Sequence, residues 1–149
     1  MNLLPILPSL AENTDFLNHP DAEPLVPMTV EFFNKIGYAP PWIGYFAQRN
    51  DQLVGSAAFK GAPKNGQVEI AYGVFPAYQQ QGIGTKICHQ LIQLAVNYDP
   101  TVTVTARTLP EENYSTQILR KNGFVYTGVI WDDDDGDVWE WVYKGNSVG

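Results

Sequence analysis

Residues 68–96, VEIAYGVFPAYQQQGIGTKICHQLIQLAV, form the stretch around which the fold is organised. Its first eight residues are mostly apolar, with Glu69 as the only carboxylate, and they predict a buried strand. The next ten residues are rich in glutamine and glycine and predict a turn. After the turn, apolar residues recur at the spacing of one helix face: Ile83, Ile87, Leu91 and Leu94 or Ala95. The stretch therefore predicts a strand, a turn and a helix buried along one side.

The predicted turn has features that favour a bound anion. The first four backbone N–H groups of a helix have no partner inside the helix, and the helix dipole attracts negative charge to the same end. Gly82 and Gly84 lack a Cβ atom, so the main chain can approach a bound group closely. A strand that leads into such a turn can hold a phosphate group. A tight turn without any ligand has the same pattern, so Gly-x-Gly alone leaves both readings open.

The neighbouring residues distinguish between phosphate-binding motifs. A dinucleotide fingerprint requires a glycine where Ile87 stands, and the residues around Gly82 do not match a P-loop. Residues 79–84, QQQGIG, instead match the Gln/Arg-x-x-Gly-x-Gly/Ala signature and resemble GCN5-related N-acetyltransferases (GNAT). The resemblance implies acetyl-CoA as co-substrate, with its pyrophosphate held by main-chain amides of the turn. The cofactor-binding residues that it implies are Val74, Gln79, Gln80, Gln81, Gly82, Ile83, Gly84 and Thr85.

Length and composition set further limits. The 149 residues suit one domain, 1–149, that can bury a substantial core. The net charge of -7 argues against a nucleic-acid surface and fits either a cationic acceptor or simple solubility. Cys88 is the only cysteine, so no internal disulfide can form, and a packing role is expected for it. No apolar run approaches the length of a membrane span and no signal peptide is recognised, so we expect a cytoplasmic protein without a membrane partner.

The rest of the chain predicts a mixed α/β fold. We expect an antiparallel meander that leads into a parallel β-α-β core, followed by a C-terminal hairpin. Leu3–Leu7 is expected to be an edge strand or an extended arm. Predicted helices span Met28–Ile36 and about Glu111–Lys121. The other predicted strands span Trp42–Ala47, Leu53–Phe59, Val102–Ala106, Phe124–Trp131 and Val138–Tyr143.

A second segment, residues 106–124, also resembles GNAT proteins, in the branch that acetylates ribosomal-protein N-termini and related amines. Ser115 lies eight residues before Gly123, as that pattern requires. The segment departs from the pattern at Glu112, where relatives carry asparagine, and at Leu119, where many carry a tyrosine that protonates the CoA thiolate. Ser115 is our candidate hydrogen-bond donor in its place, although an ordinary polar residue on a helix would fit equally.

The resemblance implies direct attack of a primary amine on acetyl-CoA within a ternary complex. A free amine has a pKa of about 10.4, so only about one molecule in a few thousand is nucleophilic at neutral pH. Glu69 is the candidate general base, and the alternative is a carboxylate that faces solvent or pairs with Lys64. In relatives an N–H near Val74 polarises the thioester carbonyl.

Some questions stay open at the level of sequence. The amine acceptor is not identified: a peptide N-terminus, a lysine, a polyamine, an aminoglycoside or an amino acid would each fit. A non-catalytic acyl-CoA sensor of the same fold is the alternative function, and a homodimer is one option for the assembly. Residues 132–137, DDDDGD, predict a solvated hairpin tip that could attract a cationic acceptor, and their spacing is not that of a calcium loop, so no metal site is expected.

Overall fold

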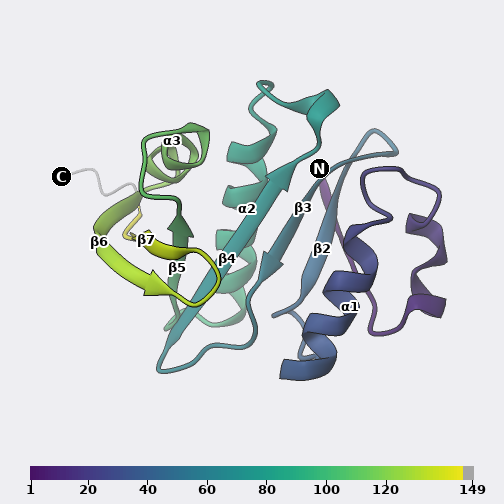
Figure 1. Ribbon diagram of the computed structural model, residues 1–149, viewed down its shortest axis with the longest axis horizontal. Helices are drawn as coiled ribbons and strands as arrows, with labels where there is room; N and C mark the ends of the chain where they lie inside the picture. Colours follow the sequence, from purple (N-terminus) through teal and green to yellow (C-terminus); the bar gives the residue numbers. More distant parts are fainter. Residues whose placement is uncertain (146–149) are drawn as a thin grey trace.

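The computed structural model describes residues 1–145, and its centre is one mixed sheet with helices on both faces (Figure 1). Within these residues seven strands lie in the order β1-β2-β3-β4-β5-β7-β6. The strands are β1 (Asn2–Pro5), β2 (Gly44–Arg49), β3 (Gln52–Phe59), β4 (Gln67–Val74), β5 (Thr103–Thr108), β6 (Phe124–Asp132) and β7 (Gly136–Tyr143). The helices are the 3-10 helix η1 (Leu10–Phe16), α1 (Leu25–Ile36), the 3-10 helix η2 (Pro76–Tyr78), α2 (Ile83–Tyr98) and α3 (Tyr114–Lys121). The mixed α/β class predicted from the sequence is confirmed.

Strands β2 to β4 form the predicted antiparallel meander, and β1 pairs with β2 as an antiparallel edge strand. The turn between β2 and β3 is the residue pair Asn50–Asp51, and both residues have positive φ. Asn65–Gly66, ahead of β4, has the same conformation. Two consecutive residues with positive φ match the twist of paired strands, which explains why Asn, Asp and Gly stand at these turns.

Strand β4, helix α2 and strand β5 form the predicted parallel unit, and the two strands separate after a short paired region. β4 and β5 are paired from Gln67–Thr103 to Ile70–Ala106. β4 then continues to Val74 paired only with β3, while β5 runs on beside β7 of the C-terminal hairpin. Figure 1 shows the two strands diverging towards α3 and the start of α2. The sheet is therefore open on one side of the second half of β4.

Small residues let the helices approach the sheet closely. A Cβ atom at Gly55 of β3 would lie 2.9 Å from Ile87 Cδ1 of α2, and one at Gly44 of β2 would lie 2.8 Å from Thr29 Cγ2 of α1. The predicted stripe of α2 is buried, with Ile87 and Leu91 fully enclosed. Cys88 is also fully buried and packs within this core, as expected.

Two helix starts differ from the sequence prediction. α1 begins at Leu25 rather than Met28, because Pro27 falls in its first turn, where a missing N–H costs no helical hydrogen bond. α3 begins at Tyr114 rather than about Glu111. Asn113 caps it by accepting a hydrogen bond from the Thr116 amide, so the acidic residues precede the helix instead of occupying its first turn. Within residues 1–145, no helix combines the length and apolar character needed to cross a bilayer.

Candidate functional site

The open edge of β4 presents main-chain groups between the diverging strands. The Phe75 N–H donates to Val54 of β3, and alternate residues of a strand direct their N–H and C=O groups to opposite sides. The Val74 groups therefore point towards β5, where no strand pairs with them. The side-chain amide of Gln79 donates to the Val74 carbonyl at 3.2 Å, which agrees with this direction. The Val74 N–H faces the opening and is available to a ligand.

The turn that follows β4 is held in an unusual backbone conformation. Gln80 has a φ of 63° and Gly82 a φ of 77°, both in the left-handed region. A left-handed residue other than glycine costs free energy and is found preferentially at functional sites. Gly82 is the N-cap of α2 and no side chain caps the helix there. The first amides of α2 are therefore left for solvent or for an anion.

A cleft of about 390 Å³ lies along this open edge. Its walls are formed by Tyr72, Gly73, Val74, Gln79, Gln80, Tyr114, Ser115 and Ile118. Three residues that the resemblance assigned to the cofactor, Val74, Gln79 and Gln80, are thus brought together on one wall.

The other five predicted cofactor residues do not line the cleft. Gln81 accepts a hydrogen bond from Arg49 at 3.3 Å, and Ile83 is buried in the core. A Cβ atom at Gly84 would lie 2.6 Å from Ile118 Cδ1, so this glycine allows α3 to pack against α2. Gly82 is exposed, and Thr85 binds Asn122 through its carbonyl. Any contact of Gly82, Ile83 and Gly84 with a ligand would come from the main chain.

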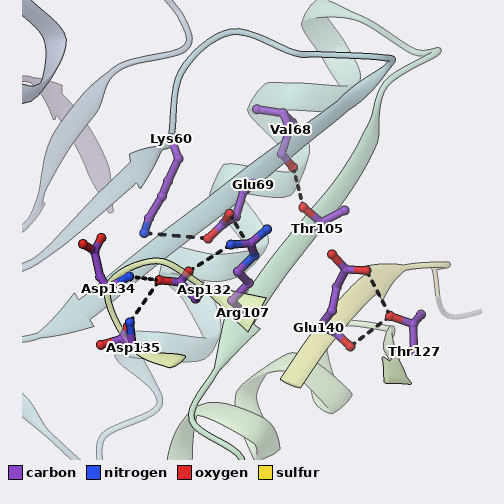
Figure 2. A network of polar contacts seen from close by, with 10 residues as sticks. All are labelled: Lys60, Val68, Glu69, Thr105, Arg107, Thr127, Asp132, Asp134, Asp135 and Glu140. Atoms are coloured by element: carbon purple, nitrogen blue, oxygen red, sulfur yellow. Dashed lines mark hydrogen bonds and ion pairs between the residues drawn. The ribbon is translucent and has the colours of Figure 1, made fainter. Parts of the chain in front are cut away.

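A second cavity, of about 260 Å³, contains Glu69. Figure 2 shows the Glu69 carboxylate directed towards Lys60 and Arg107, beside the tip of the β6–β7 hairpin. Glu69 Oε2 lies 3.7 Å from Lys60 Nζ, and Glu69 Oε1 lies 3.5 Å from Arg107 Nε. The partner named in the sequence analysis, Lys64, is not among these contacts. Ser115 lines both the cavity and the cleft, so the two spaces border the same residue.

Burial and nearby charge act on Glu69 in opposite directions. Its side chain is 20% exposed, and burial raises the pKa of the carboxyl above its ordinary value. Lys60 and Arg107 oppose this rise, while Asp132 and Glu140 add to it, and the net direction of the pKa shift is upward. A carboxylate with a raised pKa is a stronger proton acceptor, which is the property that a general base requires.

Arg107 connects Glu69 to the acidic hairpin tip. Arg107 Nη1 donates to Asp132 Oδ2 at 2.9 Å. The main-chain amides of Asp134 and Asp135 donate to Asp132 Oδ1, and these bonds together with Arg107 lower the pKa of the Asp132 carboxyl. Part of the tip that the sequence predicted to be a solvated loop therefore forms one wall of the Glu69 cavity.

Leu119 and Ser115 of α3 lie in different environments, and neither resembles the tyrosine that many relatives carry at the position of Leu119. Leu119 is 1% exposed and belongs to the core. Ser115 is exposed at the cleft, while its carbonyl lies 3.5 Å from the hydroxyl of Tyr72, which enters from β4. Burial raises the pKa of Tyr72 above its ordinary value and that of its neighbour Cys88 to about 12, so Cys88 stays a protonated thiol. Within residues 1–145, no group of three or more metal-binding side chains is assembled.

Sequence reasoning missed three residues of the site, Lys60, Tyr72 and Arg107, and it named Asp132 only as part of a hairpin tip that could attract a cationic acceptor. Strand alternation places Tyr72 opposite in direction to Glu69 and could have located it on the cleft side. Nothing local to the sequence pairs Arg107 with Asp132, since 25 residues separate them.

Comparison with known proteins identifies a domain type for most of the chain. Residues 11–125 match the acetyltransferase (GNAT) domain. No match was found among curated protein sequences.

Solved structures share the fold at low sequence identity. AAC(6')-Ib in complex with ribostamycin and coenzyme A is 21% identical, with a TM-score of 0.67 over 99% of this chain and 97% of that chain. A spermidine N-acetyltransferase chimera from Vibrio cholerae and hSSAT is 11% identical, with a TM-score of 0.67 over 95% of this chain and 94% of that chain. A ribosomal L7/L12 alpha-N-protein acetyltransferase, RimL, in complex with coenzyme A is 19% identical, with a TM-score of 0.62 over 82% of this chain and 70% of that chain.

Proposed function

The chain belongs to the GNAT acetyltransferase family, and on this premise we propose that it transfers the acetyl group of acetyl-CoA directly to a primary amine in a ternary complex. One observation carries the proposal. Ser115 lines both the cleft beside Val74 and the cavity that contains Glu69. A thioester in the cleft and an amine in the cavity would meet at this shared wall without a covalent acyl-enzyme.

The cleft supplies the groups that an acyl-CoA requires. The open edge of β4 offers hydrogen bonds to an extended amide chain, and the uncapped start of α2 offers amides and a positive dipole to a diphosphate. The Val74 N–H is the donor placed to stabilise negative charge on the thioester oxygen as the amine attacks.

The cavity supplies the proton acceptor. Amines are protonated at neutral pH, so the attacking nitrogen must lose a proton before or during attack. Glu69 is the carboxylate in the cavity with a raised pKa, and it would take that proton. The departing CoA sulfur would be released near Ser115, whose hydroxyl is the donor that we assign to it. The thiol of Cys88 is buried and protonated, which agrees with a mechanism that does not use it.

A non-catalytic acyl-CoA sensor is the second candidate, and the burial of Leu119 favours it. Many relatives carry a tyrosine acid at this position, and here the side chain is apolar and enclosed. A protein that binds acetyl-CoA without turning it over would keep the cleft and lose this group.

Release of CoA thiol from acetyl-CoA with a panel of primary amines separates the two candidates. The enzyme predicts steady-state release with at least one amine, and its loss in Glu69→Gln. The sensor predicts an acetyl-CoA-dependent rise in melting temperature with no turnover for any amine, because a ligand bound only by the folded state raises stability. Absence of both signals would reject the two candidates together.

A further inference from the structure

The Glu69 cavity continues into a groove that is unusually rich in cations for this chain. The groove, of about 410 Å³, shares Lys60, Glu69 and Arg107 with the cavity and is also lined by Lys64. Three of the nine Lys and Arg residues in a chain of net charge -7 thus line one surface feature. Two carboxylates, those of Glu69 and Glu140, face them in the groove.

The lysines of the groove are available to a ligand. Lys60 Nζ approaches Glu69 at 3.7 Å, which is too long for a hydrogen bond, and its side chain is 49% exposed. Among residues 1–145, no carboxylate lies within ion-pair distance of Lys64. Arg107 is already engaged by Asp132 at 2.9 Å. An incoming anion would therefore meet Lys64 and Lys60 before it met Arg107.

We propose that the acceptor is an anionic amine, whose nitrogen enters the Glu69 cavity while its carboxylate binds Lys60 and Lys64 in the adjoining groove. This rests on the proposed acetyl transfer. A carboxylate at Lys60 would compete with Glu69 for that lysine and leave Glu69 freer to accept the proton of the amine. A polyamine, in contrast, would bring a second positive charge into a groove where three cations outnumber two carboxylates, which like-charge repulsion disfavours.

The backbone separates the points at which the Lys64 and Glu69 side chains leave the main chain. Lys64 is bridged to Gln67, which lies two residues from Glu69 along β4. Two residues of a strand span roughly 7 Å. The carboxylate should therefore stand several bonds away from the amine, as in a dipeptide or in a peptide with an acidic residue near its N-terminus.

Glycylglycine and glycylglycinamide test this, because they carry the same amine and differ only in the carboxylate. We expect kcat/KM to be about tenfold higher for glycylglycine, as a charge-assisted contact allows, and 1,4-diaminobutane to be the poorest acceptor. Lys64→Gln should lower the ratio of the two peptides towards one, because it removes one of the two lysines that bind the carboxylate. Lys35→Gln, which removes an exposed lysine of α1 that pairs with Glu31, should keep the wild-type ratio. Added salt should reduce the ratio in the wild type, because the groove is open to solvent.

The outcomes separate this inference from the proposed function. If both peptides are acetylated at equal rates, or if Lys64→Gln keeps the wild-type ratio, the anion groove is wrong while acetyl transfer stands. If no amine is acetylated, melting temperatures measured at increasing glycylglycine concentration in the presence of CoA show whether the groove binds the peptide. A rise in wild type that is absent in Lys64→Gln would support the groove and reject catalysis, and no rise would reject both.

Discussion

The cleft beside β4 and the cavity around Glu69 are built in different ways. The cleft owes its chemistry to main-chain geometry: the unpaired edge of Val74, the left-handed Gln80 and Gly82, and the uncapped start of α2. The cavity owes its chemistry to side chains from separate elements, with Glu69 held against Lys60 and Arg107. A main-chain site tolerates many side chains, whereas a site of converging charges depends on each of them. The contrast predicts that substitutions in the cavity will change kcat/KM for the amine, whereas substitutions in the cleft will change KM for acetyl-CoA.

Glu69→Gln should cause the largest effect, and it should fall on the acceptor side. Loss of a general base lowers the rate by about 10²–10⁴-fold. We therefore expect kcat/KM for the amine to fall by about this factor while the affinity for acetyl-CoA is retained, as measured by steady-state kinetics and by titration of acetyl-CoA.

The control for this variant is Glu31→Gln, which removes an exposed carboxylate on α1. Its kinetics should match those of the wild type. A Glu69→Gln enzyme that retains wild-type kcat/KM would show that the cavity does not supply the base. The claim that the cavity depends on its charged side chains for catalysis would then be wrong.

Gly82→Ala should affect the cofactor side and stability together. Gly82 has a φ of 77° with no atom near the position of a Cβ, so alanine meets no clash there and only the left-handed backbone is penalised. This costs about 1–2 kcal/mol of unfolding free energy, and relaxation of the turn should raise KM for acetyl-CoA several-fold.

Gly66→Ala is a matched control, since Gly66 has a φ of 74° and equally open surroundings outside the cleft. Denaturant unfolding should show similar losses for both variants, with KM for acetyl-CoA raised only in Gly82→Ala. Equal KM values in the two variants would mean that the turn conformation does not serve the cofactor.

Arg107→Gln should shift the pH dependence of the acceptor side. Arg107 lowers the pKa of Glu69 against the rise caused by burial, so its removal should raise that pKa further. Glu69 must be deprotonated to act as a base, and the acidic limb of the kcat/KM profile should therefore move to higher pH. Arg107→Lys retains the charge and should leave the limb close to its original position. A limb that does not move in Arg107→Gln would assign it to another group.

The smallest expected effect is that of Glu69→Gln on stability. The folded-state pKa of Glu69 is raised, so its contribution to stability is complete below its ordinary pKa and is lost as pH rises through the folded-state value. At pH 7 the charged carboxylate thus costs stability relative to a neutral side chain. Thermal unfolding should show Glu69→Gln to be at least as stable as the wild type at pH 7, and a clear loss would mean that the ion pairs outweigh burial.

The same contrast explains what the sequence could and could not predict. The elements and the conformation of the turn before α2 follow from local patterns: apolar periodicity in α2, Asn-Gly before β4, and Gly82 at the helix start. The start of α3 was placed too early because the capping hydrogen bond from Thr116 to Asn113 competes with the general preference for acidic residues in a first turn. The different roles of Gly82, which adopts a left-handed conformation, and Gly84, which allows α3 to pack closely, were also not predictable. The role of Gly84 depends on Ile118 from another helix.

Glu69 was identified as a candidate from its isolation in an apolar strand, but its partners were not. Lys60 directly follows β3 and Arg107 belongs to β5, and only the folded sheet brings them to the same carboxylate. Side-chain networks of this kind depend on strand register, which short sequence motifs do not encode.

A crystal structure with bound CoA tests the central claim most directly, that cleft and cavity meet at one point of reaction. We predict that the diphosphate lies at the amides around Gly82, the pantetheine arm along the open edge of Val74, and the sulfur beside Ser115, facing the cavity of Glu69. A CoA molecule bound elsewhere, or one whose sulfur is separated from that cavity by packed side chains, would contradict it.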